Sequence, residues 1–256
     1  MHAYLDAGGP IALAHRGGNE AATENSMEAF EDAVQLGFRY LETDTHATAD
    51  GVLVAFHDDV LERVTDRVGA IAEMEWSELR TVRMLGGESI VRLDELLGAW
   101  SDVNFNIDPK TDEAAGRLPD VLRRVGLGLE RVCVGSFSQT RLEALRKIMG
   151  PGLCTSMGPR EVARLRAQSW GVPKILGDFE ADCAQVPVRQ GPIPVADERF
   201  VARAHALNLQ VHVWTINDAD EMHRLLDIGV DGIVTDRPRV LKSVLEARGQ
   251  WRPPEA

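Results

Sequence analysis

Short apolar segments alternate with amphipathic stretches along the chain, and this alternation constrains the fold more than any other feature. Short apolar runs bounded by polar or glycine-containing turns are typical of buried strands, whereas apolar residues recurring every three to four positions indicate helices. Strands are predicted at 11–14, 40–44, 104–108, 131–135, 152–155, 182–185, 209–213 and 232–235. Helices are predicted at 27–37, 112–126, 138–150 and 218–229.

Strands that alternate with helices pair in parallel, and eight such strands are enough to close a barrel. The sequence therefore predicts an α/β protein that consists of a single (β/α)₈ barrel, a TIM barrel, as one domain over residues 1–256. Residues 59–92 interrupt the alternation, because they are rich in charge and contain the turn signal Gly86-Gly87. We expect them to form a small insertion after the second strand region, at the mouth of the barrel.

The ends of several predicted helices carry capping residues. Ser26, Ser138 and Asn217 each precede a periodic run, where a short polar side chain accepts a hydrogen bond from a free backbone amide. Gly37 and Gly229 follow two of the runs, where glycine adopts the left-handed conformation that ends a helix. These positions fix where the strand-to-helix connections are expected to lie.

The overall charge limits the partners of the protein. The chain has 28 Lys and Arg against 40 Asp and Glu, for a formal net charge of −12. Such an acidic chain repels a phosphate backbone and an anionic membrane surface, so we expect no nucleic-acid partner. No segment approaches the roughly 20 apolar residues of a membrane helix, so no stable membrane insertion is expected. The oligomeric state is left open.

The cysteine count bears on the compartment. Cys133, Cys154 and Cys183 are scattered without the spacing of a metal site, and we interpret them as small core residues. An odd number of cysteines, with no basic start or long apolar run at the N-terminus, favours reduced thiols. We therefore expect a cytoplasmic protein.

The reactive residues of such a barrel are expected at the C-terminal ends of its strands. The first strand is followed by His15-Arg16, the second ends in Glu42-Thr43-Asp44, and the third ends in Asp108-Pro109-Lys110. Trp214 follows the seventh strand. An acid–base group, oxygen ligands for a hard cation and phosphate-binding cations thus meet at one edge, and this combination is typical of phosphoryl chemistry.

The acidic residues form a candidate metal site. Glu42 and Asp44 are two residues apart on a strand, so both side chains point the same way at roughly 6.5 Å along the strand. A solvated strand face would explain the pair equally well. Asp108 adds a third oxygen ligand at the rim, because Pro109 ends the central strand there. Lys110 either pairs with Asp108 or binds a phosphate as a point charge.

Two histidines are candidates for acid–base catalysis. His15 directly follows an apolar strand, and His57 follows the apolar run Val52-Leu53-Val54-Ala55. Asp58 or Asp59 could orient the His57 ring. Cleavage of a phosphodiester needs one base and one acid, which two histidines beside a metal can supply. The other histidines are assigned to packing or surface, with His46 facing solvent: His2, His46, His205, His212 and His223.

These motifs resemble a known family. The segment from His15 to Asp59 reads HRGGNEAATENSMEAFEDAVQLGFRYLETDTHATADGVLVAFHDD, and the chain closes with GVDGIVTDRP. Both are similar to the signatures of glycerophosphodiester phosphodiesterases, which belong to the barrel superfamily of phosphatidylinositol phospholipase C-like enzymes. The resemblance implies hydrolysis of glycerophosphodiesters to sn-glycerol 3-phosphate and an alcohol, with a divalent cation, Ca²⁺ or Mg²⁺, and a cyclic phosphate intermediate.

The resemblance also implies a role for each matching residue. The divalent cation would be held by Glu42, Asp44 and Asp108, and the acid–base pair would be His15 and His57. Arg16 and Lys110 would bind the phosphate group of the substrate. The glycerol or alcohol group would contact Trp214, together with Phe137 and Gln185. Which histidine is the acid and which alcohol is released are left open.

Asp108 departs from the family, which has glutamate there, and the shorter side chain would change how the metal sits. The same Asp-x-Lys pattern is similar to that of sphingomyelinase D enzymes. An alternative is therefore a phosphodiesterase of the lysophospholipase D or sphingomyelinase D type, acting on lysolipids. A third reading, a barrel that binds phosphodiesters without cleaving them, would need a missing histidine or ligand, and every position is filled.

Overall fold

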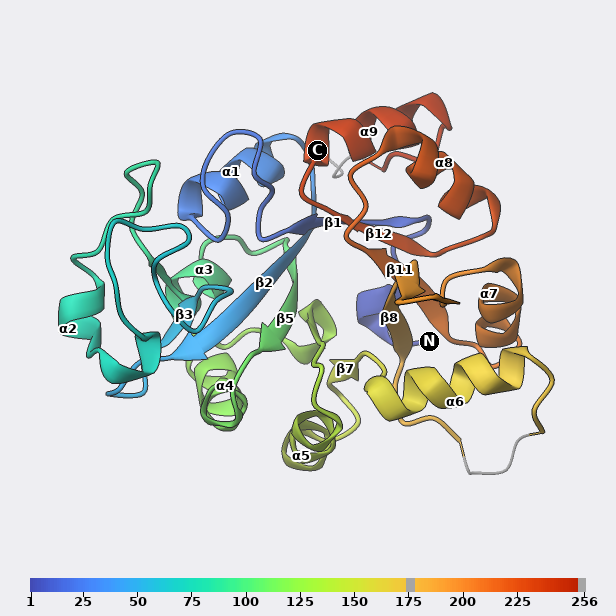
Figure 1. Ribbon diagram of the computed structural model, residues 1–256, viewed down its shortest axis with the longest axis horizontal. Helices are drawn as coiled ribbons and strands as arrows, with labels where there is room; N and C mark the ends of the chain where they lie inside the picture. Colours follow the sequence, from blue (N-terminus) through green and yellow to red (C-terminus); the bar gives the residue numbers. More distant parts are fainter. Residues whose placement is uncertain (174–177, 253–256) are drawn as a thin grey trace.

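The barrel is formed by eight parallel strands. The computed structural model describes residues 1–173 and 178–252. The strands follow the order β7-β6-β5-β2-β1-β12-β11-β8, and a parallel bridge between Ser156 and Cys183 brings the two ends of the sheet together. Their bounds are β1 Ile11–His15, β2 Tyr40–Ala47, β5 Asn104–Pro109, β6 Val132–Val134, β7 Cys154–Thr155, β8 Cys183–Pro187, β11 Gln210–Trp214 and β12 Gly232–Thr235. The predicted (β/α)₈ barrel is confirmed (Figure 1).

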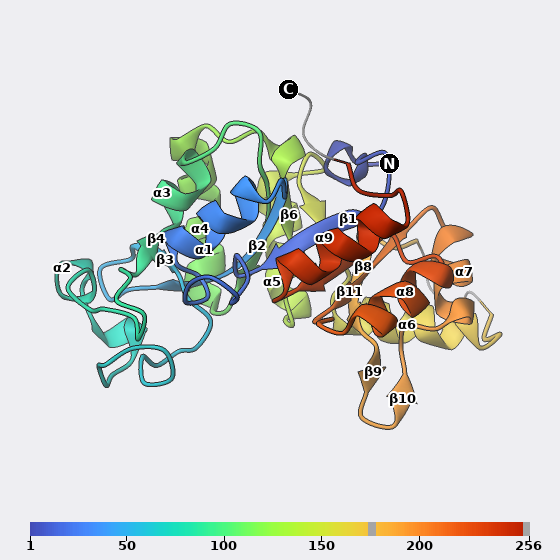
Figure 2. The ribbon, with the colours of Figure 1, turned by 90° about the horizontal axis from the view of Figure 1, so that it is seen from above.

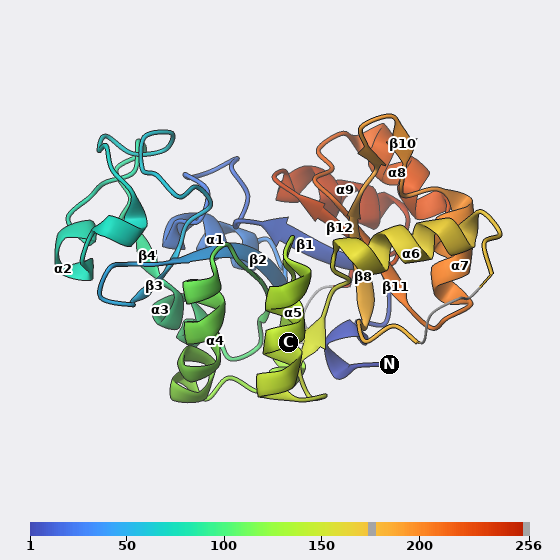
Figure 3. The ribbon, with the colours of Figure 1, turned by 60° about the horizontal axis from the view of Figure 1, so that its bottom comes forward.

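One helix follows each barrel strand and packs on its outer face, as Figure 3 shows for α4, α5 and α6. The helices are α1 Met27–Gln35, α3 Leu93–Gly98, α4 Asp112–Val125, α5 Gln139–Met149, α6 Pro159–Ser169, α7 Glu198–His205, α8 Ala219–Asp227 and α9 Pro238–Ala247. Their apolar faces and the outward side chains of the strands form one continuous core, which includes Phe30, Phe105 and Phe200. No helix of the described residues is long and apolar enough to cross a membrane.

The helix ends match the sequence patterns with one exception. The hydroxyls of Ser26 and Ser138 accept hydrogen bonds from backbone amides at the starts of α1 and α5. Gly37 and Gly229 have φ values of 100° and 87°, in the conformation expected after a helix. The cap predicted at Asn217 is wrong, because the neighbouring Asp218 caps α8. The Asn217 side chain instead accepts hydrogen bonds from the hydroxyl of Thr235, the last residue of β12, and from the backbone amide of Asp236.

An extended segment between β2 and α3 lies at the mouth of the barrel. It contains β3 (Leu53–Ala55), a 3₁₀ turn η2 (Ile71–Glu73), α2 (Trp76–Leu79) and β4 (Val91–Arg92). β3 runs antiparallel to β2, so the chain returns toward the mouth just before His57. The segment has an apolar cluster of its own, which includes Phe56 and Leu61. Figure 2 shows this segment, and the hairpin of β9 (Arg189–Gln190) and β10 (Ile193–Pro194), projecting from the barrel.

The interior of the barrel is filled by its own cluster of side chains. Leu13, Val234 and the three cysteines pack together inside the ring of strands. A 3₁₀ turn, η1 (Ala3–Leu5), contributes Tyr4 and Leu5 to the same cluster. In Figure 2 the N-terminal segment lies at the opposite end of the barrel from the β9–β10 hairpin. A second turn of this type, η3 (Leu129–Arg131), precedes β6.

The packing inside the barrel leaves no room for a side chain at Gly232. A Cβ atom there would lie 2.8 Å from Cδ2 of His212 and 3.1 Å from the carbonyl oxygen of Ile11. We predict that Gly232→Ala lowers the free energy of unfolding by about 1–3 kcal/mol, the usual cost of overpacking a core. Urea unfolding of both variants would measure it against Gly116→Ala. Gly116 is an exposed residue of α4 with open space around it, and alanine there should stabilise the protein by up to about 1 kcal/mol.

Candidate active site

The His15 ring is held from behind by a carboxylate. Its Nδ1 lies 2.5 Å from Oδ1 of Asp236, which follows β12, and its Nε2 lies 3.7 Å from Oε2 of Glu42. Asn217 donates from its side-chain nitrogen to the other oxygen of Asp236 at 2.8 Å. Burial alone would lower the pKa of His15, but Glu42 and Asp236 outweigh it, and the pKa of His15 is raised. The Nε2 atom is therefore the nitrogen left for chemistry.

The His57 ring is held by a carboxylate in the same way. Its Nδ1 lies 2.5 Å from Oδ1 of the adjacent Asp58. Arg63 donates to the second oxygen of Asp58 and, at 2.6 Å, to Glu24. Asp58 is thus the residue that orients His57, which the sequence had narrowed to Asp58 or Asp59. The side chain of His57 is 35% exposed, so it remains accessible from solvent.

The interpretation of His46 as solvent-facing is wrong. Its side chain is buried, with 5% of the residue exposed, and its Nε2 lies 3.0 Å from the carbonyl oxygen of His57. A carbonyl oxygen can only accept, so this nitrogen carries a proton and donates it. β2 and β3 pair at this point, and the segment at the mouth covers the side chain. His46 thereby fixes the backbone at His57, consistent with its assignment to packing.

Two cations neutralise the buried carboxylates between the histidines. Nζ of Lys110 lies 2.7 Å from Oδ1 of Asp44 and 2.7 Å from Oδ2 of Asp108. Burial opposes ionisation of Asp44, but Lys110 and Arg16 outweigh it and hold the pKa of Asp44 below its usual value. Burial raises the pKa of Asp108, and the charge of Asp44 adds to the effect. Lys110 therefore pairs with Asp108, as the sequence allowed, but it pairs with Asp44 as well.

The negative charge of Glu42 is less well neutralised by nearby cations than the charges of the neighbouring carboxylates. It is buried, accepts a hydrogen bond from the backbone amide of Arg16 at 3.1 Å, and has a pKa raised to about 7 by burial and by the charge of Asp44. Nε of Arg16 and Oδ2 of Asp44 lie 2.8 Å apart, yet neither atom has a hydrogen-bond partner of good geometry among the described residues. The site thus holds an excess of buried negative charge and two buried polar atoms without hydrogen bonds.

The chain turns sharply after β1, which brings Arg16 over the carboxylates. Arg16 has a φ of 55° and Gly17 a φ of 81°. A Cβ at Gly17 would lie 2.7 Å from the backbone nitrogen of Phe30, so only glycine allows α1 to approach this closely. The guanidinium of Arg16 also donates to Glu24 at 2.9 Å. The turn therefore aims Arg16 at the acidic cluster instead of at solvent.

An aromatic wall borders the cluster. The rings of Trp214 and Phe137 meet edge to face with centroids 5.6 Å apart, and Nζ of Lys110 lies 5.9 Å from the centroid of Phe137. Phe137 is 68% exposed, so the wall faces solvent. Gln185 lies deeper, because it pairs in register with His212 whereas Trp214 pairs with Pro187. Its side chain contacts Asn106 and His212 inside the barrel.

Comparison with known proteins decides the family. Residues 15–240 match the model of the glycerophosphoryl diester phosphodiesterase family. The chain belongs to this family. A protein of Mycobacterium tuberculosis named "Probable glycerophosphodiester phosphodiesterase 2" is 38% identical over 257 residues, which cover 97% of this chain and 95% of the relative. The protein is therefore a phosphoric diester hydrolase.

Solved structures show the same fold. A Silicibacter pomeroyi protein assigned to the glycerophosphoryl diester phosphodiesterases superimposes with a TM-score of 0.82 at 24% identity, covering 98% of this chain and 100% of that one. An Oleispira antarctica phosphodiesterase, solved in complex with its product sn-glycerol-3-phosphate, superimposes with a TM-score of 0.78 at 23% identity over 94% and 99% of the two chains. At this identity the likeness extends to the barrel alone.

The candidate site of the phosphodiesterase also contains residues that sequence reasoning missed. Asp236 and Asn217 support His15, and Arg63 links Asp58 to Glu24. The closing motif GVDGIVTDRP was recognised, but nothing in it shows that its second aspartate lies against a histidine more than two hundred residues away. The strand-end rule could have found Asp236, because it directly follows β12 and the mouth collects residues at such positions.

Asp236 gives a test of how His15 is tuned. Asp236→Asn removes the charge that raises the pKa of His15, so whichever limb of the pH–rate profile His15 controls should move to lower pH. We expect kcat to fall at least about tenfold, as for other residues that orient a catalytic group. The control is Asp231→Asn, because Asp231 also pairs with a histidine, His205 at 2.8 Å, but precedes β12. An unchanged profile in Asp236→Asn would contradict the assignment.

Proposed function

We propose that the protein hydrolyses glycerophosphodiesters to sn-glycerol 3-phosphate and an alcohol, with a divalent metal ion as cofactor. The observation that carries the proposal is the pair of histidines, His15 and His57, each held at Nδ1 by a carboxylate at 2.5 Å and bordering one acidic cluster. The Oleispira phosphodiesterase was solved with sn-glycerol-3-phosphate, the same product that the proposed reaction would release. A small-molecule substrate also suits a chain with a net charge of −12, which disfavours nucleic acid.

The two histidines would act as an acid–base pair. One Nε2 takes the proton of the glycerol 2-hydroxyl, whose oxygen forms a bond to phosphorus. The bond from phosphorus to the alcohol oxygen breaks, and the other histidine gives that oxygen its proton. Water then opens the cyclic phosphate with the two roles exchanged. Asp236 and Asp58 keep both rings oriented.

Arg16 and Lys110 would bind the phosphate oxygens. Both are now paired with carboxylates: Lys110 with Asp44 and Asp108, and Arg16 with Asp44 and Glu24. With a divalent cation bound, the carboxylates would no longer need Arg16 and Lys110 to neutralise them. The guanidinium and the ammonium could then turn to a phosphate group, for which a planar fork and a point charge are both suited.

The acidic cluster fits a hard cation in its chemistry. Glu42, Asp44 and Asp108 offer only oxygen ligands, as Ca²⁺ and Mg²⁺ prefer. Their negative charge exceeds what Lys110 and Arg16 neutralise, since the pKa of Glu42 is raised to about 7 by burial and by Asp44. Among the described residues, Oδ2 of Asp44 has no hydrogen-bond partner of good geometry. When bound, the metal would stabilise the charge that develops on the phosphate oxygens.

Metal removal tests this assignment. We predict that exhaustive chelation abolishes phosphodiesterase activity and lowers the melting temperature, since a ligand that binds only the folded state stabilises it. Adding back Ca²⁺, Mg²⁺ or Mn²⁺ separately should restore both and identify the effective ion. Asp108→Glu, which restores the family's side chain, should keep the response, whereas Asp108→Asn should weaken it. If the protein kept full activity while elemental analysis showed that it contained no metal, a metal cofactor would be excluded.

The shape of the mouth favours a small substrate. Trp214 and Phe137 form an apolar wall beside Lys110, which suits the carbon chain of a glycerol group placed next to its phosphate. Gln185 could contact the same ligand only from deeper in the barrel. The segment over residues 59–92 has charges throughout its length. An acyl tail would need an apolar groove instead, because each buried methylene contributes about 0.8 kcal/mol.

The three free thiols of the described residues agree with a cytoplasmic location.

A direct assay tests the proposed function. We predict a higher kcat/KM for glycerophosphocholine or glycerophosphoethanolamine than for lysophosphatidylcholine at matched monomeric concentrations. Release of glycerol 3-phosphate from the diesters is compared with release of choline from the lysolipid. His57→Ala serves as the control and should lower turnover at least about a hundredfold. Preference for the lysolipid would support the lysophospholipase D alternative, and activity on neither substrate would support a barrel that only binds.

A further inference from the structure

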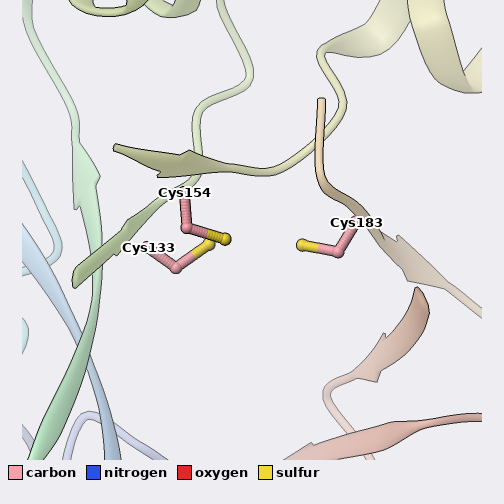
Figure 4. A group of neighbouring side chains, drawn as sticks. All are labelled: Cys133, Cys154 and Cys183. Atoms are coloured by element: carbon pink, nitrogen blue, oxygen red, sulfur yellow. The ribbon is translucent and has the colours of Figure 1, made fainter. Parts of the chain in front are cut away.

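Three cysteines converge inside the barrel, away from the mouth. Cys133, Cys154 and Cys183 come from β6, β7 and β8, and their sulfur atoms all lie within 4.8 Å of one another. Among residues 1–173 and 178–252, this is the one group of three or more Cys, His, Asp or Glu side chains so close together. All three residues are fully buried and carry free thiols. Figure 4 shows the three sulfurs pointing toward a common centre.

The register of the strands explains this convergence. Cys133 and Cys154 are direct partners across β6 and β7, and Cys183 is level with Ser156 where β8 meets β7. Ser156 follows Cys154 by two residues, and side chains two residues apart on a strand point to the same side, so all three cysteines point into the barrel. Gln185 follows Cys183 by two residues on β8 and bonds to Asn106, which places a polar layer between the thiols and the mouth.

The hydroxyl of Tyr4 is a second, independent sign of a ligand site. Tyr4 is 1% exposed, belongs to the same cluster as the three cysteines, and its hydroxyl has no hydrogen-bond partner among the described residues. The ring is held edge to face against Tyr40 at 5.2 Å, and Tyr40 donates to the carbonyl oxygen of Tyr4. A buried hydroxyl without a partner costs free energy.

The chemistry of this group selects a soft metal. Thiolate sulfur prefers ions such as Cu⁺, Zn²⁺ and Cd²⁺ over the hard cations that suit carboxylates. At a metal–sulfur distance of about 2.3 Å, ligands in a tetrahedral site lie about 3.8 Å apart, so the sulfurs would need to move by about 1 Å or less.

We propose that Cys133, Cys154 and Cys183 form a binding site for a thiophilic metal ion, with the Tyr4 hydroxyl as a fourth ligand. Tyr4 lies on the short turn η1, and the turn is tied to the barrel by a contact between His2 and the carbonyl oxygen of Gly152. If this turn moved away from the barrel, a metal ion could reach the thiols from the end of the barrel opposite the mouth. The site is separate from the carboxylate cluster in position and in metal preference.

Cadmium is a suitable probe, because its thiolate complexes absorb in the ultraviolet. The protein is reduced, freed of metal and saturated with Mg²⁺ to occupy the carboxylates, and is then titrated with Cd²⁺. We expect one Cd²⁺ per chain, a thiolate-to-metal charge-transfer band and a higher melting temperature. Cys183→Ser should lose the band. Val134→Ala, a change at an equally buried residue of β6, should keep it.

Tyr4→Phe tests the fourth ligand without changing the volume of the core, and should weaken Cd²⁺ binding about tenfold while keeping the charge-transfer band. Equal affinity in Tyr4→Phe and the unaltered protein would remove Tyr4 from the site. Three reactive thiols in denaturant but no band with Cd²⁺ would overturn the proposal and leave the cysteines as packing residues. Fewer than three thiols before any reduction would indicate a disulfide and would also overturn it. Phosphodiesterase activity enters none of these readouts.

Discussion

The active site depends on the neutralisation of one buried carboxylate. Asp44 is 1% exposed and is held between the ammonium of Lys110 and the guanidinium of Arg16. An unpaired charge at this depth would be strongly unfavourable, so the turn after β1 and the end of β5 must both bring a cation to the end of β2. Glu42 lies near the same two cations, and Asp108 shares Lys110. Both are less well compensated than Asp44, and a divalent ion would neutralise the negative charge that remains.

The barrel interior changes in polarity along its axis, and the two proposed sites use its two ends. Charged side chains gather at the C-terminal ends of the strands, where backbone and solvent can still reach them. In the middle, Gln185 bonds to both Asn106 and His212. Below them Leu13, Val234 and the cysteines form an apolar cluster. Hard oxygen ligands near water and soft sulfur ligands away from it favour different metals.

Much of the fold was predictable, because strand and helix periods are local properties of the chain. All eight barrel strands were placed, and Ser26 and Ser138 were correctly identified as caps. Asn217 was misplaced because Asn and Asp serve equally well as caps, and the choice of Asp218 depends on a contact of Asn217 with Asp236. His46 was misjudged because alternation along β2 does not reveal that the segment after it returns to cover the strand.

The sequence by itself determined the barrel, the catalytic candidates at the strand ends and the family to which the chain belongs. Periodicity and short-range spacing carry that information, since each strand end lies beside its own motif. Only the tertiary structure decided which side chains meet across the barrel. Asp236 reaches His15, and three cysteines without any metal-like spacing converge with Tyr4. Closing a parallel sheet into a barrel brings side chains of distant βα units together in its interior. Which of these side chains meet depends on the strand register, which no local pattern records.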